Sequence, residues 1–378
     1  MLRSVFQSLF SFFKYSVFTI NPEKPNVVLL DMHQPAVGRS LRMLLISFQM
    51  AGLTVYIRVV PGRKALSIAK MLRWHPNAKI IWVPVTFTKN LILCTDKPTR
   101  YENNVFLKKI YLHFNYSPDV KLSAGHYACP FIMHPQLYGE YGEHNFLEKY
   151  RHSQRSLKIL FAGNYNADYQ NSFIKDVWGK ISRQEIIEHL RKNPEVKLIS
   201  SIDEIPNLLA GGYKNSVVLI DNNLRVNQAN WMKLLSSADF FICPPGLNVP
   251  MSHNLIESLA IGTIPLTNYA EWVVPNLKNG KNAILFSSLD ELDQSIQEIL
   301  RMNKDDVLQL RQQAITYYSD NLSHREFVKR LLDCSEDVVH LHLINGDKQS
   351  VIASMINKGI GHVRIYQSTT TAGQLQNW

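Results

Sequence analysis

Cysteine is scarce in this chain of 378 residues, and the spacing of its four cysteines argues against two classes of protein. They stand at positions 94, 129, 243 and 334, so no Cys-x-x-Cys pair occurs and neither a disulfide framework nor a zinc site is indicated. Scattered cysteines of this kind are typical of proteins in a reducing compartment. We therefore expect a cytoplasmic protein.

Long hydrophobic runs, short repeats and low-complexity tracts are also missing. Near the N-terminus only ten residues separate Arg3 from Lys14, too few for a helix that spans a bilayer. We expect residues 1–20 to form an amphipathic helix on an anionic membrane surface, which would make the protein peripheral. A helix docked on the protein body is the alternative, whereas a signal peptide lacks a clear cleavage site. The apolar positions at helical spacing are Leu2, Val5, Phe6, Leu9, Phe13 and Val17.

Acidic residues are few in the first part of the chain. Residues 1–155 contain 20 Lys and Arg against 8 Asp and Glu, while the remainder contains 21 against 23. This asymmetry indicates that the first part faces an anionic partner, which can be a nucleic acid, an acidic glycan or an anionic membrane leaflet. A solvated basic surface is the alternative. Nucleic acid is the least favoured partner, because no recognised nucleic-acid motif is present.

Apolar runs alternate with helical periods along the chain, which predicts an α/β protein with parallel sheets. The length and the apolar content of 46% suit about two domains. In the first part we expect strands at 26–32, 54–60 and 79–83, and helices at 41–50 and 65–74. In the second part we expect strands at 157–161, 196–200 and 217–220, and helices at 182–191, 228–235, 289–302 and 304–318.

The most informative segment runs from position 238 to 266. It joins a buried strand, a Pro-Pro-Gly turn, a helix and a second buried strand. In an open α/β sheet such a unit places backbone N–H donors at the carboxyl end of the strand, and phosphates bind at the helix N-terminus. A carboxylate beside phosphate is unfavourable unless it binds another group. We therefore expect Glu257 to lie near the mouth of the site and to bind a ribose.

This segment resembles the donor-sugar region of GT-B glycosyltransferases, and most closely that of the exostosin-like group. The matching residues are Pro244, Pro245, Gly246, Ser252, Glu257, Ala260, Gly262, Ile264 and Pro265. Asn254 departs from the pattern, because that group has a basic residue there. The resemblance implies two Rossmann-like domains that face each other across a cleft, and transfer of a sugar from a nucleotide-sugar donor to a glycan or lipid-linked acceptor.

On this interpretation the chain divides into four segments. Residues 1–20 are the amphipathic helix, 21–150 an N-terminal acceptor domain, and 151–320 a C-terminal donor domain. Residues 321–378 are expected to form helices that pack back toward the first domain, followed by a polar tail. A glycan that grows on a lipid at the membrane face, as in lipopolysaccharide assembly, would account for both the basic first domain and the N-terminal helix.

The resemblance implies a donor site at the carboxyl ends of the second domain's strands. Gly163 allows close approach of the backbone to a phosphate or sugar. Because position 254 lacks a basic residue, Arg183 and Arg225 are the candidate cations for the diphosphate. No Asp-x-Asp occurs, so neither a divalent metal nor another cofactor is expected. The expected donor-binding residues are Gly163, Asn164, Tyr165, Arg183, Arg225, Pro245, Gly246, Ser252, Asn254 and Glu257.

A base that removes the acceptor's proton is expected from the first domain. His33 and Asp31 follow the first strand, where some inverting GT-B enzymes have a catalytic His or Asp, and Arg39 and Ser40 are expected to bind the acceptor. The Glu-x7-Glu pattern of a large retaining group is absent, since Val249 stands eight positions before Glu257. This favours inversion. Rival candidates for the base are His126, His134, Glu140 and Glu143.

Two other functions remain open. A nucleotide-sugar epimerase of the same fold needs no second acceptor, but it would need carboxylates around the sugar, and the first domain is poor in acids. A non-catalytic module that binds a nucleotide or a glycan is the other, and the absence of a basic residue at Asn254 is its main support.

Overall fold

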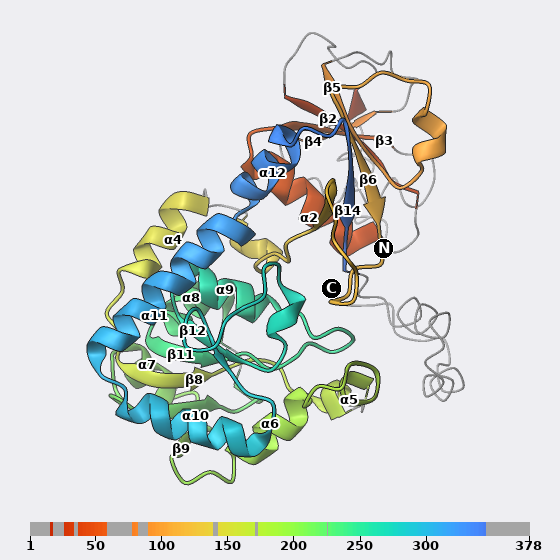
Figure 1. The fold of residues 1–378 in the computed structure, drawn as a ribbon. Helices are drawn as coiled ribbons and strands as arrows, with labels where there is room; N and C mark the ends of the chain where they lie inside the picture. Colours follow the sequence, from red (N-terminus) through yellow and green to blue (C-terminus); the bar gives the residue numbers. More distant parts are fainter. Residues whose placement is uncertain are drawn as a thin grey trace, which may run out of the picture.

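The computed structural model describes residues 16–17, 26–33, 37–58, 78–81, 90–138, 143–170, 173–224 and 226–344. In this part of the chain two parallel sheets, each accompanied by helices, form two lobes (Figure 1). We call the lobe built on β2–β7 and β14 the first lobe, and the lobe built on β8–β13 the second lobe.

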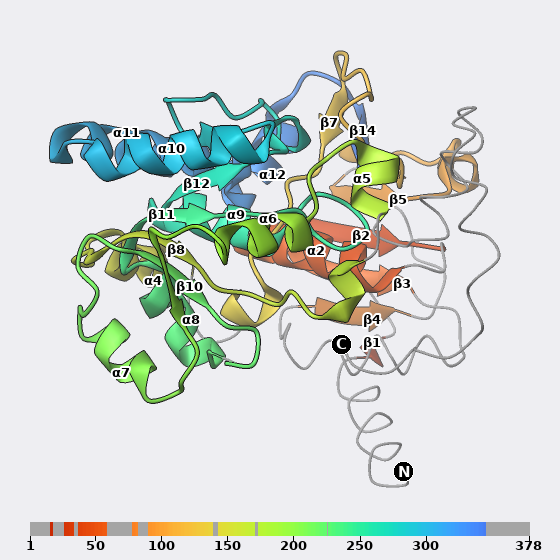
Figure 2. The same cartoon turned by 90° about the horizontal axis from the view of Figure 1, so that it is seen from below.

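The first sheet has eight strands among the described residues, in the order β1-β4-β3-β2-β5-β6-β14-β7 (Figure 2). All neighbouring strands are parallel. The chain leaves β2 toward β3 and β4 on one side and later adds β5 and β6 on the other. Strand order therefore reverses between β2 and β5, and in open α/β sheets ligands bind at such a switch point. The bounds are β1 Ser16–Val17, β2 Val27–Asp31, β3 Thr54–Arg58, β4 Ala78–Ile81, β5 Leu91–Thr95, β6 Lys108–His113, β7 His126–Ala128 and β14 Val338–His342.

The second sheet has six described strands in the order β13-β12-β11-β8-β10-β9, again all parallel. Here the order reverses between β8 and β11, which gives a second switch point. Strands β8 and β10 are buried along their whole length, as expected for central strands covered on both faces. The bounds are β8 Leu157–Phe161, β9 Val196–Ile199, β10 Val217–Ile220, β11 Ala238–Ile242, β12 Ile264–Thr267 and β13 Ile284–Leu285. Two Rossmann-like units confirm the predicted α/β, GT-B class of fold.

The helices connect the strands and join the two lobes. In Figure 1, α11 and α12 follow one another along one side of the molecule, and α12 packs against α2 of the first lobe. Side-chain caps begin four of the described helices, at Ser182, Asn227, Ser288 and Asn303. The helix bounds are α2 Val37–Met50, α4 Glu143–Arg151, α5 Phe173–Trp178, α6 Arg183–Leu190, α7 Glu204–Leu209, α8 Gln228–Leu235, α9 His253–Ile261, α10 Leu289–Arg301, α11 Lys304–Tyr317 and α12 His324–Asp333.

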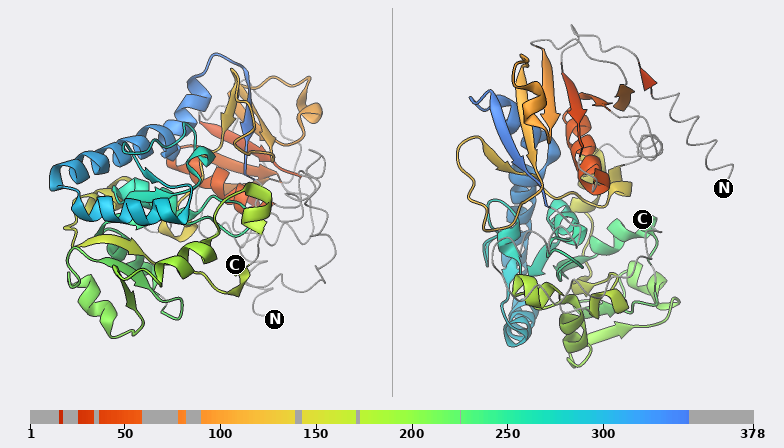
Figure 3. Two further views of the ribbon diagram at one scale, coloured as in Figure 1. Left: turned by 60° about the horizontal axis from the view of Figure 1, so that its bottom comes forward. Right: turned by 90° about the vertical axis from the view of Figure 1, so that its right-hand side faces the viewer.

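Two expectations about the ends of the chain are wrong in part. Beyond α12, residues 338–342 do not continue as helix but enter the first sheet as β14, between β6 and β7 (Figure 3, right). The reason is the alternation in Val-Val-His-Leu-His, which buries Val339 and Leu341 on one face of the sheet. Residues 16–17, predicted as the end of a helix, pair with Ile80 and Ile81 as strand β1. The rest of segment 1–20 and the polar tail lie outside the described residues.

A chain of hydrogen bonds holds α12 on the first lobe. The buried His324 contacts Ser47 Oγ of α2 through Nδ1 at 2.9 Å and the Tyr138 hydroxyl through Nε2 at 2.8 Å. Ser47 donates its own proton to the Met43 carbonyl, so it accepts from His324 Nδ1–H. The Tyr138 hydroxyl then donates to Nε2. This arrangement requires the neutral imidazole with its proton on Nδ1.

Four histidines on one face of the first sheet hold β14 in place. The rings of His126 and His340 stack at 4.4 Å between centroids, and those of His113 and His342 at 4.9 Å. His113 Nε2 lies 2.9 Å from His340 Nδ1, and His126 Nδ1 lies 2.9 Å from His342 Nε2. Each pair needs one donor and one acceptor nitrogen, so the cluster is satisfied by neutral rings.

The histidine cluster makes the fold sensitive to acid. Burial, reinforced by the neighbouring rings, lowers the pKa of His113 and His340 and lowers that of His342 to about 4. The unfolded chain therefore binds protons first, and stability is expected to fall as the pH drops from about 6.5 toward 4. Denaturant unfolding measured across this range checks the prediction. His342→Gln should flatten the profile, and an unchanged profile would contradict it.

Candidate functional site

The first switch point brings together His33, Asp96 and Arg100. His33 follows β2 and Asp96 follows β5, and the pairing of these strands places Asp31 beside Thr95. Asp96 accepts from the backbone N–H of His33 at 2.9 Å, and its Oδ1 lies 3.2 Å from His33 Nδ1. Arg100, from the short helix η2 (Pro98–Tyr101), has Nη1 2.7 Å from His33 Nε2.

These contacts determine the tautomer of His33. A carboxylate accepts hydrogen bonds, so Nδ1 carries a proton and donates it to Asp96. A guanidinium has donors but no acceptor, so Nε2 is unprotonated and accepts from Arg100. An imidazole oriented through Nδ1–H by a carboxylate and with its lone pair on Nε2 is the arrangement of a general base. The side chain of His33 is 20% exposed.

Asp31 lies close to the same imidazole, with its Oδ1 3.6 Å from His33 Nε2, and its assignment as a catalytic residue stays a prediction. It is only 2% exposed and accepts a hydrogen bond from the Tyr101 hydroxyl. Arg58 donates to that hydroxyl at 2.8 Å and lies 3.8 Å from the carboxylate, while Arg100 lies 3.5 Å away. Burial, together with Asp31, raises the pKa of Tyr101 to about 12, so its hydroxyl remains a donor. Asp31 is thus engaged by Tyr101 and Arg58, with the more exposed Arg100 close to it.

The two residues expected to hold the acceptor give different results. Ser40 is 5% exposed, because it lies on the buried side of α2, and its role as an acceptor ligand is therefore wrong. Arg39 belongs to α2, but its side chain lies outside the described residues.

The second switch point brings the loop after β8 against the start of α9. A Cβ on Gly163 would lie 3.4 Å from Asn254 Nδ2, so the two residues are in close approach. At Gly246 a Cβ would meet the carbonyl oxygens of Val249 and Met251 at 2.6 and 2.7 Å, which only glycine avoids. Ser252 occupies the N-cap position of α9, and among the described residues its side chain makes no cap hydrogen bond. The first N–H groups of α9 thus lack the usual side-chain partner.

Arg183 is not a free cation for a diphosphate, contrary to the prediction. It is 5% exposed, and its guanidinium donates to the carbonyls of Asn164 at 2.6 Å and Pro245 at 3.0 Å. It also stacks 4.4 Å above the ring of Tyr169. The side chain therefore joins the β8 loop to the Pro-Pro-Gly turn. The other candidate cation, Arg225, lies outside the described residues.

Tyr165 is likewise structural, so its placement among the donor ligands is wrong. Its hydroxyl accepts from the backbone N–H of Asn222 at 2.8 Å and from Arg191 at 2.9 Å, and its own N–H donates to the Asn222 side chain. These bonds tie the loop after β8 to the loop after β10. Asn164 is exposed, and its side chain accepts from the N–H of Asn166.

Glu257 does not lie at an open mouth. It is 2% exposed, and its two oxygens accept from the backbone N–H of His134 at 2.8 Å and from Trp231 Nε1 at 2.7 Å. Burial raises its pKa to about 6, although both hydrogen bonds lower it. The reason is position: Glu257 is in the second turn of a helix that is buried from Leu255 to Ile261. Its carboxylate joins α8, α9 and the segment that links the lobes.

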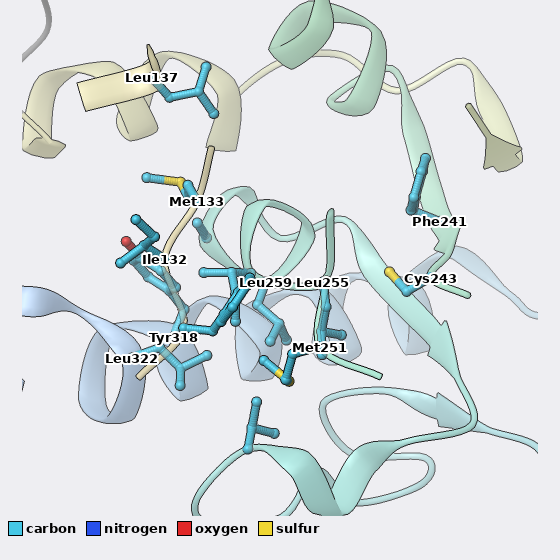
Figure 4. Packing of buried hydrophobic residues seen from close by; sticks show 14 of the residues in the cluster. Ile132, Met133, Leu137, Phe241, Cys243, Met251, Leu255, Leu259, Tyr318 and Leu322 are labelled. Atoms are coloured by element: carbon cyan, nitrogen blue, oxygen red, sulfur yellow. The ribbon is translucent and has the colours of Figure 1, made fainter. Parts of the chain in front are cut away.

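That linking segment, residues 130–138, packs along α9. Figure 4 shows Ile132 and Met133 on the side of Leu259 of α9, with Leu137 farther along the segment. His253, in the first turn of α9, has Nδ1 2.7 Å from the Ile132 carbonyl, so this nitrogen donates a hydrogen bond to the linking segment.

The rival bases can also be placed. His126 belongs to the histidine cluster of the first sheet, where its Nδ1 is engaged with His342. The ring of His134 packs edge to face against His253, and burial lowers its pKa. Glu140 and the side chain of Glu143 lie outside the described residues.

Sequence reasoning missed Asp96, Arg100, Tyr101 and His253. A weak signal existed for Asp96, which directly follows the apolar run at 91–95 just as His33 follows the first strand.

No group of three or more His, Cys, Asp or Glu side chains is arranged to hold a metal ion within the described residues. No described helix is both long enough and apolar enough to cross a membrane.

Comparison with known proteins gives structural likeness without a sequence match. No family model and no curated protein matches the chain. A glycosyltransferase from Rickettsia africae is 12% identical, with 82% of this chain and 98% of that one covered and a TM-score of 0.44. Anabaena Alr3699/HepE in complex with UDP is 10% identical, with coverage of 81% and 99% and a TM-score of 0.43. Sucrose-phosphate synthase from Thermosynechococcus elongatus is 11% identical, with coverage of 82% and 98% and a TM-score of 0.41. The functional assignment therefore rests on this chain's own residues.

Proposed function

We propose that this protein transfers a sugar from a nucleotide-sugar donor, held by the second lobe, to a hydroxyl group of an acceptor held by the first lobe. The observation that carries the proposal is His33: its Nδ1–H is directed at Asp96, its Nε2 is unprotonated, and it lies at the switch point of the first sheet. An imidazole held in this state is suited to remove a proton from a hydroxyl as it attacks.

The donor half of the proposal uses the second switch point. The diphosphate binds at the N-terminus of α9, where the Ser252 side chain does not cap the helix, and the sugar lies beside Gly163 and the turn at Gly246. Charge on the leaving diphosphate is then stabilised by backbone N–H groups and the helix dipole rather than by a metal ion. Because Glu257 is already bonded to His134 and Trp231, it fixes α9 instead of presenting a carboxylate to solvent.

Base catalysis by His33 gives a direct, inverting displacement. The acceptor oxygen forms a bond to the anomeric carbon as its proton passes to His33 Nε2, and the bond to the diphosphate breaks with its electron pair. Asp96 stabilises the imidazolium that forms. The acceptor is proposed to be a glycan or a lipid-linked glycan, consistent with the positive charge of residues 1–155. The resemblance to the exostosin-like group is supported only by the segment around Gly246.

A thermal-shift panel of nucleoside diphosphates and free nucleosides, each with and without EDTA, tests the donor site. One class of nucleoside diphosphate is expected to stabilise the protein by about 2.7 kcal/mol at a hundred times its dissociation constant, and EDTA should leave the shift unchanged. The nucleoside without phosphate should stabilise it much less, because the helix N-terminus binds the phosphates.

The variant Asn254→Asp makes this test specific for the helix N-terminus. A carboxylate in the first turn of α9 favours the helix itself but repels a diphosphate, so the free protein should unfold as before while the shift is lost. Asn103→Asp, at an exposed position of the first lobe, is the matched control and should keep the full shift. Equal shifts for both variants would show that α9 does not bind the diphosphate.

A further inference from the structure

Arg100 donates a hydrogen bond to His33 Nε2, the nitrogen that takes the acceptor's proton in the proposed reaction. Its Nη1 lies 2.7 Å from His33 Nε2, so the lone pair that would take the acceptor's proton already accepts a hydrogen bond from a cation. The Arg100 side chain is 44% exposed, whereas the carboxylates of Asp31 and Asp96 are almost fully buried. Of the groups around His33, the guanidinium is therefore the one that can leave by rotating into solvent.

We propose that Arg100 blocks the base in the absence of acceptor, and that the acceptor carries a phosphate or carboxylate group that draws Arg100 away from His33. This inference rests on the proposed function, since it assigns the acceptor class at the same site. His33 can take a proton only when Arg100 no longer donates a hydrogen bond to Nε2. Binding of the acceptor, which removes Arg100, therefore also activates the base. Water alone has no charge with which to displace the guanidinium, and the donor is protected from hydrolysis.

The charges around His33 favour an anion as the displacing group. Asp31 is already bonded to Tyr101 and paired with Arg58, so Arg100, 3.5 Å away, is not needed to neutralise it. With His33 neutral, two carboxylates balance two guanidinium groups. When Arg100 moves away, the proton that His33 takes from the acceptor replaces the positive charge that has left, while the anionic group of the acceptor stays paired with Arg100. A guanidinium binds phosphate or carboxylate through two parallel hydrogen bonds, which a single imidazole nitrogen cannot match.

Nitrogen NMR of protein labelled in its histidine rings tests this directly, without any turnover. In mildly alkaline buffer, where imidazoles are neutral, His33 Nε2 should show the resonance of a hydrogen-bonded acceptor, assigned by its loss in His33→Asn. Glucose 6-phosphate or glucuronate should move this resonance toward that of a free nitrogen, while glucose should not. The two anions distinguish phosphate from carboxylate as the preferred group.

Arg100→Ala and the matched control Arg301→Ala, at an exposed position of α10, complete the experiment. In Arg100→Ala the Nε2 resonance should already be that of a free nitrogen and should not respond to either anion. Hydrolysis of the donor without acceptor should rise by about tenfold or more, the equivalent of losing one charge-assisted hydrogen bond. Arg301→Ala should behave as the wild type in both measurements.

A Nε2 resonance that is unchanged in Arg100→Ala, or that glucose moves as strongly as the anions do, would overturn the proposal. The NMR result does not depend on the donor. If no nucleotide sugar is turned over by any variant but the Arg100-dependent shift is observed, the proposed transfer fails while the anion-responsive contact stands.

Discussion

Replacement of His33 by alanine is expected to reduce sugar transfer by about 100-fold to 10,000-fold, the usual contribution of a general base. Nucleotide binding should be unchanged, because His33 belongs to the first lobe and the donor site to the second. The measurement is the rate of transfer at saturating donor, with nucleotide affinity determined separately by thermal shift. His152→Ala, at a position directly after α4 where the side chain is 82% exposed, is the matched control and should keep full activity.

Asp96→Asn extends the same test to the orientation of the ring. An amide can donate to the imidazole as well as accept, so the proton is no longer held on Nδ1, and transfer should fall with a changed pH profile. Full activity of His33→Ala would sink the base assignment. A protein that binds nucleotide through α9 but transfers no sugar under any condition would instead be the non-catalytic module.

Replacement of Glu257 by alanine is expected to lower the free energy of unfolding by about 2 to 6 kcal/mol. Two partly buried donors, the His134 backbone N–H and Trp231 Nε1–H, would lose their acceptor, at about 1 to 3 kcal/mol each. Glu298→Ala, at an exposed site on α10, should change stability by less than about 0.5 kcal/mol. Denaturant unfolding of the three proteins provides the measurement.

A second variant tests whether Glu257→Ala loses stability because two hydrogen-bond donors are left without an acceptor. Trp231→Phe removes one of the two donors, so the double variant should be less destabilised than the sum of the single variants. Strict additivity would show that the loss came from packing rather than from an unsatisfied hydrogen bond.

The stability deficit of Glu257→Ala should also depend on pH. In the folded protein the pKa of Glu257 is about 6, above its usual 4.5, so the folded state binds the proton more tightly than the unfolded chain. This contribution is complete below pH 4.5 and is lost as the pH rises through 6, by about 2 kcal/mol. The deficit should therefore be larger at pH 4.5 than at pH 7. The opposite trend would mean that the carboxylate is buried in its charged form without cost.

Much of the fold could be predicted because its signals are local. Buried parallel strands appear as short apolar runs, as in Val27–Asp31 and Leu157–Phe161, and the helices between them have an apolar face at the helical period. The turns at Gly163 and Gly246 could also be predicted from a local signal, because glycine after a strand favours a tight turn of the backbone. β14 was missed because five alternating residues after a helix are a weak signal.

Local sequence patterns were enough to place residues at the ends of the strands, and therefore to single out His33 and the loop at Gly163. The partners that these residues contact depend on how the strands pair in the folded protein. Asp96 contacts His33, 63 positions earlier in the sequence, because β5 pairs with β2. Arg183 donates hydrogen bonds to two backbone carbonyls and is not available for a ligand. Strand order and burial are set by the packing of the whole chain. Residue type sets which reactions and contacts a side chain can make. The residues that pack around it decide whether its polar atoms are available to a ligand or already hydrogen-bonded within the protein.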